Sequence, residues 1–226
     1  MHSTQNIQRP TLVGLELPDP PERWEALGFV VVDGAIELGG VRVGLGAETV
    51  RWAIDGIALT DEIDGLPMTS APAAGRSQPQ HPNRAIGLDH VVVATPDFDR
   101  TARALEAAGM PLRRIRDAGG FRQGFRRLGP AILELVASAG AAEGGAQRPA
   151  DGPARFWGLV ITVPDLSWLA SQFRKEGAGE PGAGGARLGE IRPAVQPGRQ
   201  IATLKGNTGL GLAVAFMTPE PGVEER

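Results

Sequence analysis

Two side chains in this sequence are placed to bind a metal ion or to exchange a proton, His90 and Glu134. Each lies in an apolar run typical of a β-strand, LDHVVV for His90 and AILELV for Glu134. Because residues two apart on a strand share a face, each polar group lies among apolar neighbours. A buried carboxylate is costly unless a metal, an imidazole or an arginine satisfies it. His90 and Glu134 are therefore our candidate catalytic residues and metal ligands, and the alternative is that they hydrogen-bond to each other without metal.

Four further residues are candidates for contacting a ligand. Six arginines cluster between residues 113 and 127 of the central region. Strand alternation sends Arg126 and Arg127 to opposite faces, so only part of this cluster can line a site. An inward-facing Arg126 or Arg199 would favour an anionic ligand, although a solvated sheet edge is the alternative. Trp157 could flank a flat ligand, although it could equally belong to the core. Gln123 could contribute an amide oxygen.

The elements that must position His90 and Glu134 lie between residues 86 and 137. The strand that contains His90 stops at Pro96-Asp97, where proline cannot continue a ladder and the polar residue can cap a helix. Apolar residues at helical spacing predict a helix over 98–108, with Gly109 as its stop. Glycine and proline then divide the chain into three strands. The segment is a βαβββ unit, with strands at 88–94, 112–117, 121–128 and 131–136.

This unit, with a histidine in its first strand and a glutamate in its last, resembles a module of the vicinal oxygen chelate superfamily, which includes glyoxalase I, extradiol dioxygenases and bleomycin-resistance proteins. The resemblance implies an α+β fold in which tandem βαβββ modules pair curved mixed sheets around a cavity. It also implies that an enzyme's metal is held by side chains from the first and last strand of each module. His90 and Glu134 match those two positions in this module.

Two more copies of the pattern are present in the chain. Residues 155–217 contain a strand closed by Pro164-Asp165, a helix over 167–176 and strands at 191–195, 199–204 and 210–216. An abbreviated copy occupies residues 10–60, with a strand at 11–17, a helix at 21–27, short strands at 29–33, 35–38 and 41–45, and one extra strand within 50–59. Repeats at this scale are architectural. We therefore expect residues 86–217 to form the paired domain.

The last module does not repeat the metal-binding residues. Aligning its Pro-Asp signal with that of the central module places Gly158 opposite His90, and 212–215 (LAVA) falls opposite Glu134. Two of the four ligands that the resemblance implies are therefore missing. A divalent ion such as Zn, Ni, Mn or Fe would have only one imidazole and one carboxylate, so no cofactor is assigned with certainty.

Composition narrows the classes of partner. At 226 residues, 42% hydrophobic and a net charge of −3, the chain has the profile of a soluble globular protein, and it lacks the basicity typical of nucleic-acid binding. Cysteine is absent, which excludes disulfides and thiolate sites. No apolar run is long enough to span a membrane, and no apolar signal core is visible, so a cytoplasmic location is the default.

Two polar segments separate the copies. Residues 61–85, rich in proline, serine and glycine, are interpreted as a linker, and we expect His81 within it to be solvated. Residues 138–154 form a second linker. The abbreviated copy has no counterpart with which to pair, so it either packs on the edge of the same domain or pairs with its equivalent in a second chain, which makes a homodimer the natural hypothesis.

Two functions remain open from the sequence. The chain could be a metal-dependent lyase, isomerase or dioxygenase acting on a substrate with vicinal oxygens through His90 and Glu134. It could also be a metal-free binding protein, like the bleomycin-resistance branch, that holds a small anionic or vicinal-oxygen molecule. The missing ligands of the last module favour the second, and catalysis stays uncertain because a fold alone does not fix function.

Overall fold

The computed structural model describes residues 9–71, 78–118, 120–138, 151–176 and 185–222. The middle of each expected linker lies outside these residues.

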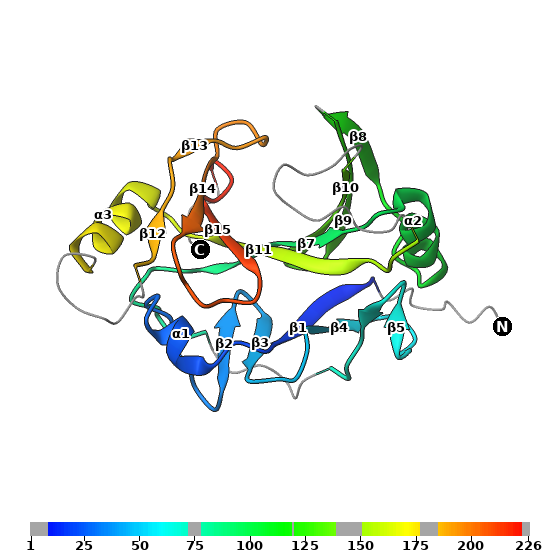
Figure 1. Cartoon of the computed structure of the whole chain (residues 1–226), viewed down its shortest axis with the longest axis horizontal. Coiled ribbons are helices and arrows are strands. Elements are labelled where there is room, and N and C mark those ends of the chain that lie inside the picture. The colour runs from blue at the N-terminus through cyan, green and yellow to red at the C-terminus, as the bar shows by residue number, and fades with distance from the viewer. Residues whose placement is uncertain (1–8, 72–77, 119, 139–150, 177–184, 223–226) are drawn as a thin grey trace.

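One nine-stranded sheet contains the central and last modules (Figure 1). It runs in the order β12-β14-β15-β11-β7-β10-β9-β8, with β13 paired to β14. In each module the first and last strands are parallel, and the antiparallel pair β7–β11 joins the two modules. The expected α+β fold of tandem βαβββ modules is confirmed. The central module comprises β7 (Gly87–Ala94), α2 (Phe98–Ala107), β8 (Arg114–Ala118), β9 (Phe121–Leu128) and β10 (Ala131–Ser138).

The last module repeats this order, but the strands that follow its helix directly, β12 and β13, are only two residues long each. It comprises β11 (Arg155–Thr162), α3 (Leu166–Glu176), β12 (Arg187–Leu188), β13 (Arg192–Pro193), β14 (Gln200–Lys205) and β15 (Ala213–Met217). The strand expected over 191–195 is only two residues long, because Pro193 lacks the N–H that a longer ladder needs.

Both long helices begin at the Pro-Asp signals found in the sequence. The Asp97 side chain accepts a hydrogen bond from Arg100 N at 2.9 Å, and the Asp165 side chain accepts one from Trp168 N at 2.8 Å. These bonds satisfy N–H groups that the first turn of a helix leaves without partners. The helices then bury Phe98, Leu105 and similar residues on one face of the sheet.

The N-terminal unit forms its own four-stranded sheet in the order β2-β3-β1-β4. β1 and β3 are parallel, and β4 is antiparallel to β1, as β11 is to β7. The strand expected over 29–33 is reduced to a bridge between Val32 and Ala35. The elements are β1 (Thr11–Leu17), α1 (Pro21–Glu25), β2 (Ala35–Leu38), β3 (Val41–Leu45) and β4 (Arg51–Asp55).

This unit packs within the chain, beneath β7 and β11 in Figure 1. Trp52 lies edge-on to Phe156 of β11 with ring centroids 5.5 Å apart, and Phe29 stacks on Phe216 of β15 at 6.4 Å. Buried residues from all three units form one continuous core. Of the two arrangements left open by the sequence, the structure has packing within the chain, so the reason for expecting a dimer no longer holds.

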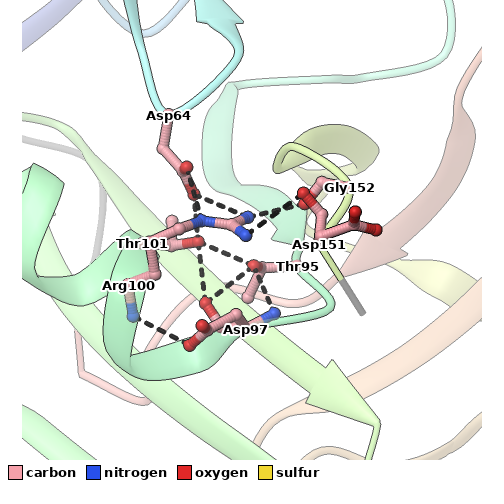
Figure 2. Close-up of polar contacts among 7 residues, drawn as sticks. All are labelled: Asp64, Thr95, Asp97, Arg100, Thr101, Asp151 and Gly152. Carbon is pink, nitrogen blue, oxygen red and sulfur yellow. Dashed lines mark hydrogen bonds and ion pairs between the residues drawn. The ribbon is translucent and has the colours of Figure 1, made fainter. Parts of the chain in front are cut away.

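Part of the segment interpreted as a linker is ordered. Residues 61–68 form a hairpin of β5 (Glu62–Ile63) and β6 (Leu66–Pro67), and its turn residue Asp64 reaches α2 (Figure 2). Arg100 Nε donates to Asp64 Oδ1 at 2.8 Å, and Arg100 Nη2 donates to the Gly152 carbonyl at 2.6 Å. The Thr101 hydroxyl donates to the other Asp64 oxygen. The turn thus fastens the hairpin to the start of the helix.

The prediction that His81 is solvated was wrong. Its side chain is 2% exposed, with Nδ1 accepting from Val30 N and Nε2 donating to the Glu37 carbonyl, both at 3.0 Å. Burial lowers the pKa of His81, partly offset by the Glu37 carbonyl. A neutral ring satisfies two backbone groups of the N-terminal unit. His81 is thus a structural histidine, although the polar composition of its segment indicated a linker.

Candidate functional site

His90 and Glu134 lie on the same face of the nine-stranded sheet. Leu133 and Leu135 of β10 point into the core, so Glu134 between them points to the opposite face. Register places His90 between Ile132 of β10 and Val160 of β11. In Figure 1 the strands at the two ends of the sheet rise away from the N-terminal unit, and this face therefore lies on the concave side.

Glu134 is held by a relay of side chains from two neighbouring strands. Arg116 Nε of β8 donates to Gln123 Oε1 of β9 at 2.7 Å, and Gln123 Nε2 donates to Glu134 Oε1 at 2.7 Å. The first bond fixes the amide orientation that the second requires. The Arg116 guanidinium also lies over the Phe125 ring, 5.2 Å from its centroid.

The environment of Glu134 favours its protonated form. Burial raises the pKa of Glu134, and the charges of His90 and Arg116 and the Gln123 bond offset this only in part. A carboxyl with a raised pKa can carry a proton closer to neutral pH than an ordinary glutamate, so it can donate a hydrogen bond as well as accept one.

His90 contacts the residue that precedes it in the chain. His90 Nδ1 lies 2.5 Å from Asp89 Oδ2, although the contact does not have the alignment of a hydrogen bond. Successive strand residues normally point to opposite faces, but here a β-bulge intervenes. Leu88 pairs with Ile161 and His90 with Val160, so Asp89 is the extra residue of β7. The bulge allows the two side chains to meet.

Asp89 in turn binds Arg199, which lies just before β14. Arg199 Nη2 donates to Asp89 Oδ1 at 2.5 Å, Arg199 Nη1 donates to Oδ2 at 3.3 Å, and Arg199 Nε donates to the Thr218 carbonyl at 2.6 Å. Burial raises the pKa of Asp89, but His90 and Arg199 outweigh it and bring the pKa to about 2. Asp89 is therefore ionised at neutral pH, and its bonds to Arg199 join the central module to the last.

The structure brings together four of the six predicted site residues. His90, Glu134, Gln123 and Arg199 belong to two groups of contacting polar side chains on the concave side. Hydrogen bonds join Arg116, Gln123 and Glu134, and in the second group Arg199 donates to Asp89, which His90 contacts. No hydrogen bond joins His90 directly to Glu134 in the described part of the chain, contrary to one alternative above. Their coupling is electrostatic.

Arg126 and Trp157 stand apart from these groups. Arg126 pairs with the core residue Leu133 and therefore points to the opposite face from Gln123. Trp157 is the extra residue of a second bulge, between Phe156 and Gly158 of β11, and is 49% exposed rather than part of the core.

Sequence reasoning missed Asp89 and Arg116. Alternation assigns Asp89 to the face opposite His90, and only the bulge reverses this. Arg116 was one of six clustered arginines. The signal available for it was that it lies two residues from Arg114 and so shares a strand face with it, and in the structure it pairs with Gln123.

The described residues do not match the metal site that the fold family implies. The pseudo-symmetric equivalents of His90 and Glu134 are Gly158 and Ala215, as the strand register shows, and neither has a donor side chain. Glu134 Oε1 is already bonded to Gln123. In the described ranges, no group of three or more His, Cys, Asp or Glu side chains is placed to hold an ion. One imidazole and one carboxylate fall short of a protein-built divalent site.

An apolar patch lies next to the polar groups. Val92, Val160 and Met217 form a small buried cluster separate from the main core, with Val136, Ile201 and other residues packed against it. Val92 pairs directly with Glu134, and Val160 with His90. The concave side thus combines a carboxyl that has a raised pKa with an apolar floor.

A pocket of about 380 Å³ lies elsewhere, on the N-terminal sheet, where Glu16, Arg42 and Arg51 line it among others. It contains none of the residues predicted as a site.

No helix in the described ranges is long and apolar enough to cross a membrane.

Comparison with known proteins supports the fold. No family model matches the sequence, and no curated protein matches it. A triple mutant of 4-hydroxymandelate synthase from Streptomyces coelicolor matches at 15% identity and a TM-score of 0.59, covering 92% of each chain. This likeness shows that the two chains share their overall fold, in line with the tandem βαβββ modules described above.

Two methylmalonyl-CoA epimerases match over a smaller part of the chain, both at a TM-score of 0.47. The enzyme from Mycobacterium tuberculosis is 20% identical and covers 61% of this chain and 91% of its own. The enzyme from Streptomyces coelicolor, in complex with 2-nitronate-propionyl-CoA, is 19% identical and covers 63% and 99%.

Proposed function

We propose that this chain binds a small anionic molecule with vicinal oxygens on the concave side of its nine-stranded sheet, using Glu134 as a protonated hydrogen-bond donor and no resident metal. The observation that supports the proposal is the relay that ends on Glu134. Arg116 and Gln123 fix one carboxyl oxygen, and burial raises the pKa of the group. A neutral carboxyl can donate a hydrogen bond to a ligand oxygen.

The surroundings define the class of ligand. The apolar floor of Val92 and Val160 suits a hydrophobic body, and the Arg116 guanidinium favours a negative charge near Glu134. His90 is coupled electrostatically to Glu134 and is held by the anionic Asp89. A compound that has an apolar ring and two adjacent oxygens, one of them in a carboxylate, meets all these conditions.

The test is calorimetric titration of EDTA-treated full-length protein with 4-hydroxymandelate. The fold relative described above is named for making this compound, which has an aromatic ring and a hydroxyl next to its carboxylate. We expect Glu134→Ala to weaken binding by about tenfold or more, since a hydrogen bond to a charged group is lost. Glu106→Ala, on the exposed surface of α2, should bind as the wild type does.

A second ligand tests the requirement for vicinal oxygens. 4-Hydroxyphenylacetate lacks only the 2-hydroxyl group. It should bind more weakly, because the site's polar group that bonds this hydroxyl in 4-hydroxymandelate would be left without a partner. The proposal fails if neither compound binds, or if Glu134→Ala binds 4-hydroxymandelate as tightly as the wild type.

A further inference from the structure

We propose that Arg9, Arg113 and Arg126 form a second anion site, separate from the concave side, that binds a doubly charged oxyanion such as a phosphate group. The site lies where the start of the N-terminal unit meets β9. It goes beyond the function proposed above, because Arg126 points to the opposite face of the sheet from Gln123 and Glu134.

Two of the arginines lie next to each other at the end of the β8–β9 ladder. Arg114, the first residue of β8, pairs with Phe125 of β9, so Arg113 and Arg126 each lie one residue beyond this last pair. Arg113 N donates to the Phe125 carbonyl at 2.9 Å, out of the register of the ladder, and this bond holds Arg113 beside β9. Like charges on neighbouring strands repel.

The third arginine comes from the N-terminal unit. Arg9 precedes β1, and the Thr11 hydroxyl donates to its carbonyl at 3.0 Å. Thr11 packs against Gly129 at the end of β9, so closely that a Cβ on Gly129 would lie 2.4 Å from the Thr11 methyl carbon. This contact brings the start of the N-terminal unit, where Arg9 lies, against the end of β9, and the charge of Arg9 lowers the pKa of Arg126.

Arg126 has no counter-charge in the described part of the chain. Its Nε is buried without a hydrogen-bond partner. Burial lowers the pKa of Arg126, and the charges of Arg113 and Arg9 lower it further. Arg122, on the same strand and face, pairs with Asp99 at 2.9 Å. Helix α2 thus supplies an acid for Arg122, and the described residues supply none for Arg126.

A bound oxyanion would satisfy these features together. It would accept from the buried Nε and neutralise three charges that otherwise repel. Three guanidinium groups suit a multiply charged tetrahedral anion better than a single carboxylate, since each fork donates two parallel bonds. Arg9 and Arg113 are exposed, so the anion could enter from solvent.

The test is the melting temperature of the full chain in a phosphate-free buffer, with sodium phosphate added against sodium chloride at equal ionic strength. Phosphate should raise the melting temperature of the wild type by several degrees, because a ligand of the native state stabilises it. Arg126→Gln should lose this shift. Arg127→Gln, the neighbour on the opposite face, should keep it.

Two further comparisons make the result decisive. Arg113→Gln changes an exposed residue and should weaken the phosphate shift even if Arg126→Gln folds poorly. Phenyl phosphate distinguishes the source of the anion: a larger shift than with inorganic phosphate assigns the site to a phosphate ester, and an equal shift assigns it to the free ion. No wild-type shift beyond that of chloride, or an equal shift in Arg126→Gln and Arg113→Gln, would overturn the proposal.

Discussion

Glu134 and Asp89 are two carboxyls on one side of a sheet whose pKa values move in opposite directions. Arg199 bonds Asp89 and His90 contacts it, so Asp89 stays ionised at neutral pH. Glu134 accepts a hydrogen bond from the neutral Gln123 amide, and burial has the largest effect on its pKa. In the function proposed above, the low-pKa group orients and the high-pKa group carries a proton. Both roles are testable without knowledge of the ligand.

Replacing Glu134 with glutamine should change how stability depends on pH. Folding raises the pKa of Glu134 above its ordinary value of 4.5, so its favourable contribution is complete below that pH and is lost as pH rises through the folded pKa. Glutamine does not titrate and still accepts from Gln123. The melting temperature of Glu134→Gln relative to wild type should therefore increase between pH 4 and pH 8. A constant difference across this range would show that the pKa is not raised.

Asp89→Asn should destabilise the protein most at neutral pH. The folded pKa is about 2 against an ordinary 3.8, so the stabilisation is present above pH 3.8 and is lost as pH falls through 2. The variant leaves Arg199, 4% exposed, without its counter-charge. We expect a loss of about 2 to 3 kcal/mol in chemical denaturation at pH 7, shrinking towards pH 2.

An exposed acid supplies the control for Asp89. Asp99→Asn removes the partner of Arg122, but the Asp99 side chain is 62% exposed. Its replacement should cost under about 1 kcal/mol, as is usual for surface pairs. Equal effects of the two substitutions would mean that the buried clamp does not hold the site together.

At the scale of elements, the sequence predicts regular repeats well and irregular features poorly. The strands and helices that flank each Pro-Asp signal lie within a few residues of their expected bounds, because proline and a capping aspartate act locally. The bulges at Asp89 and Trp157 depend on register with a strand about seventy residues away, which no local pattern encodes. They decide which side chains reach the site.

The turn of the β5–β6 hairpin is another irregular feature that the sequence did not predict. Asp64 has a positive φ of 50° and bonds Arg100 and Thr101 of α2 (Figure 2). Asp64→Asn retains a residue that tolerates this conformation but removes the charge, so we expect a loss of about 1 to 2 kcal/mol in denaturant unfolding. Asp61→Asn, exposed in the same segment, should change stability little. If both variants unfold alike, the turn does not fasten the helix.

At the scale of the whole molecule, the three units share one core, which the sequence did not reveal. The repeats predicted that residues 86–217 form a self-contained domain, yet Trp52 packs on Phe156 and Phe29 on Phe216 across that boundary. Composition cannot show which apolar face meets which. In the structure, the N-terminal unit packs on the face of the large sheet beneath β7 and β11.

A fragment of residues 86–217 should therefore fold poorly. Without the N-terminal unit it exposes large apolar side chains that are buried in the full chain, and patches of this kind promote aggregation. We expect the fragment to be insoluble or to melt without a cooperative transition, while the full chain melts in one step. A soluble fragment with a sharp calorimetric transition would show that the units are separable.

The central claim, that Glu134 offers a proton to an anionic ligand, is tested most directly by counting protons taken up on binding. Calorimetric titrations of 4-hydroxymandelate at pH 7, in two buffers with different ionisation enthalpies, give that number. The account predicts uptake of up to about one proton by the wild type, because binding an anion beside Glu134 favours its protonated form. Glu134→Gln should bind the ligand with no uptake. Binding by the wild type without proton uptake, or the same uptake by Glu134→Gln, would contradict the account.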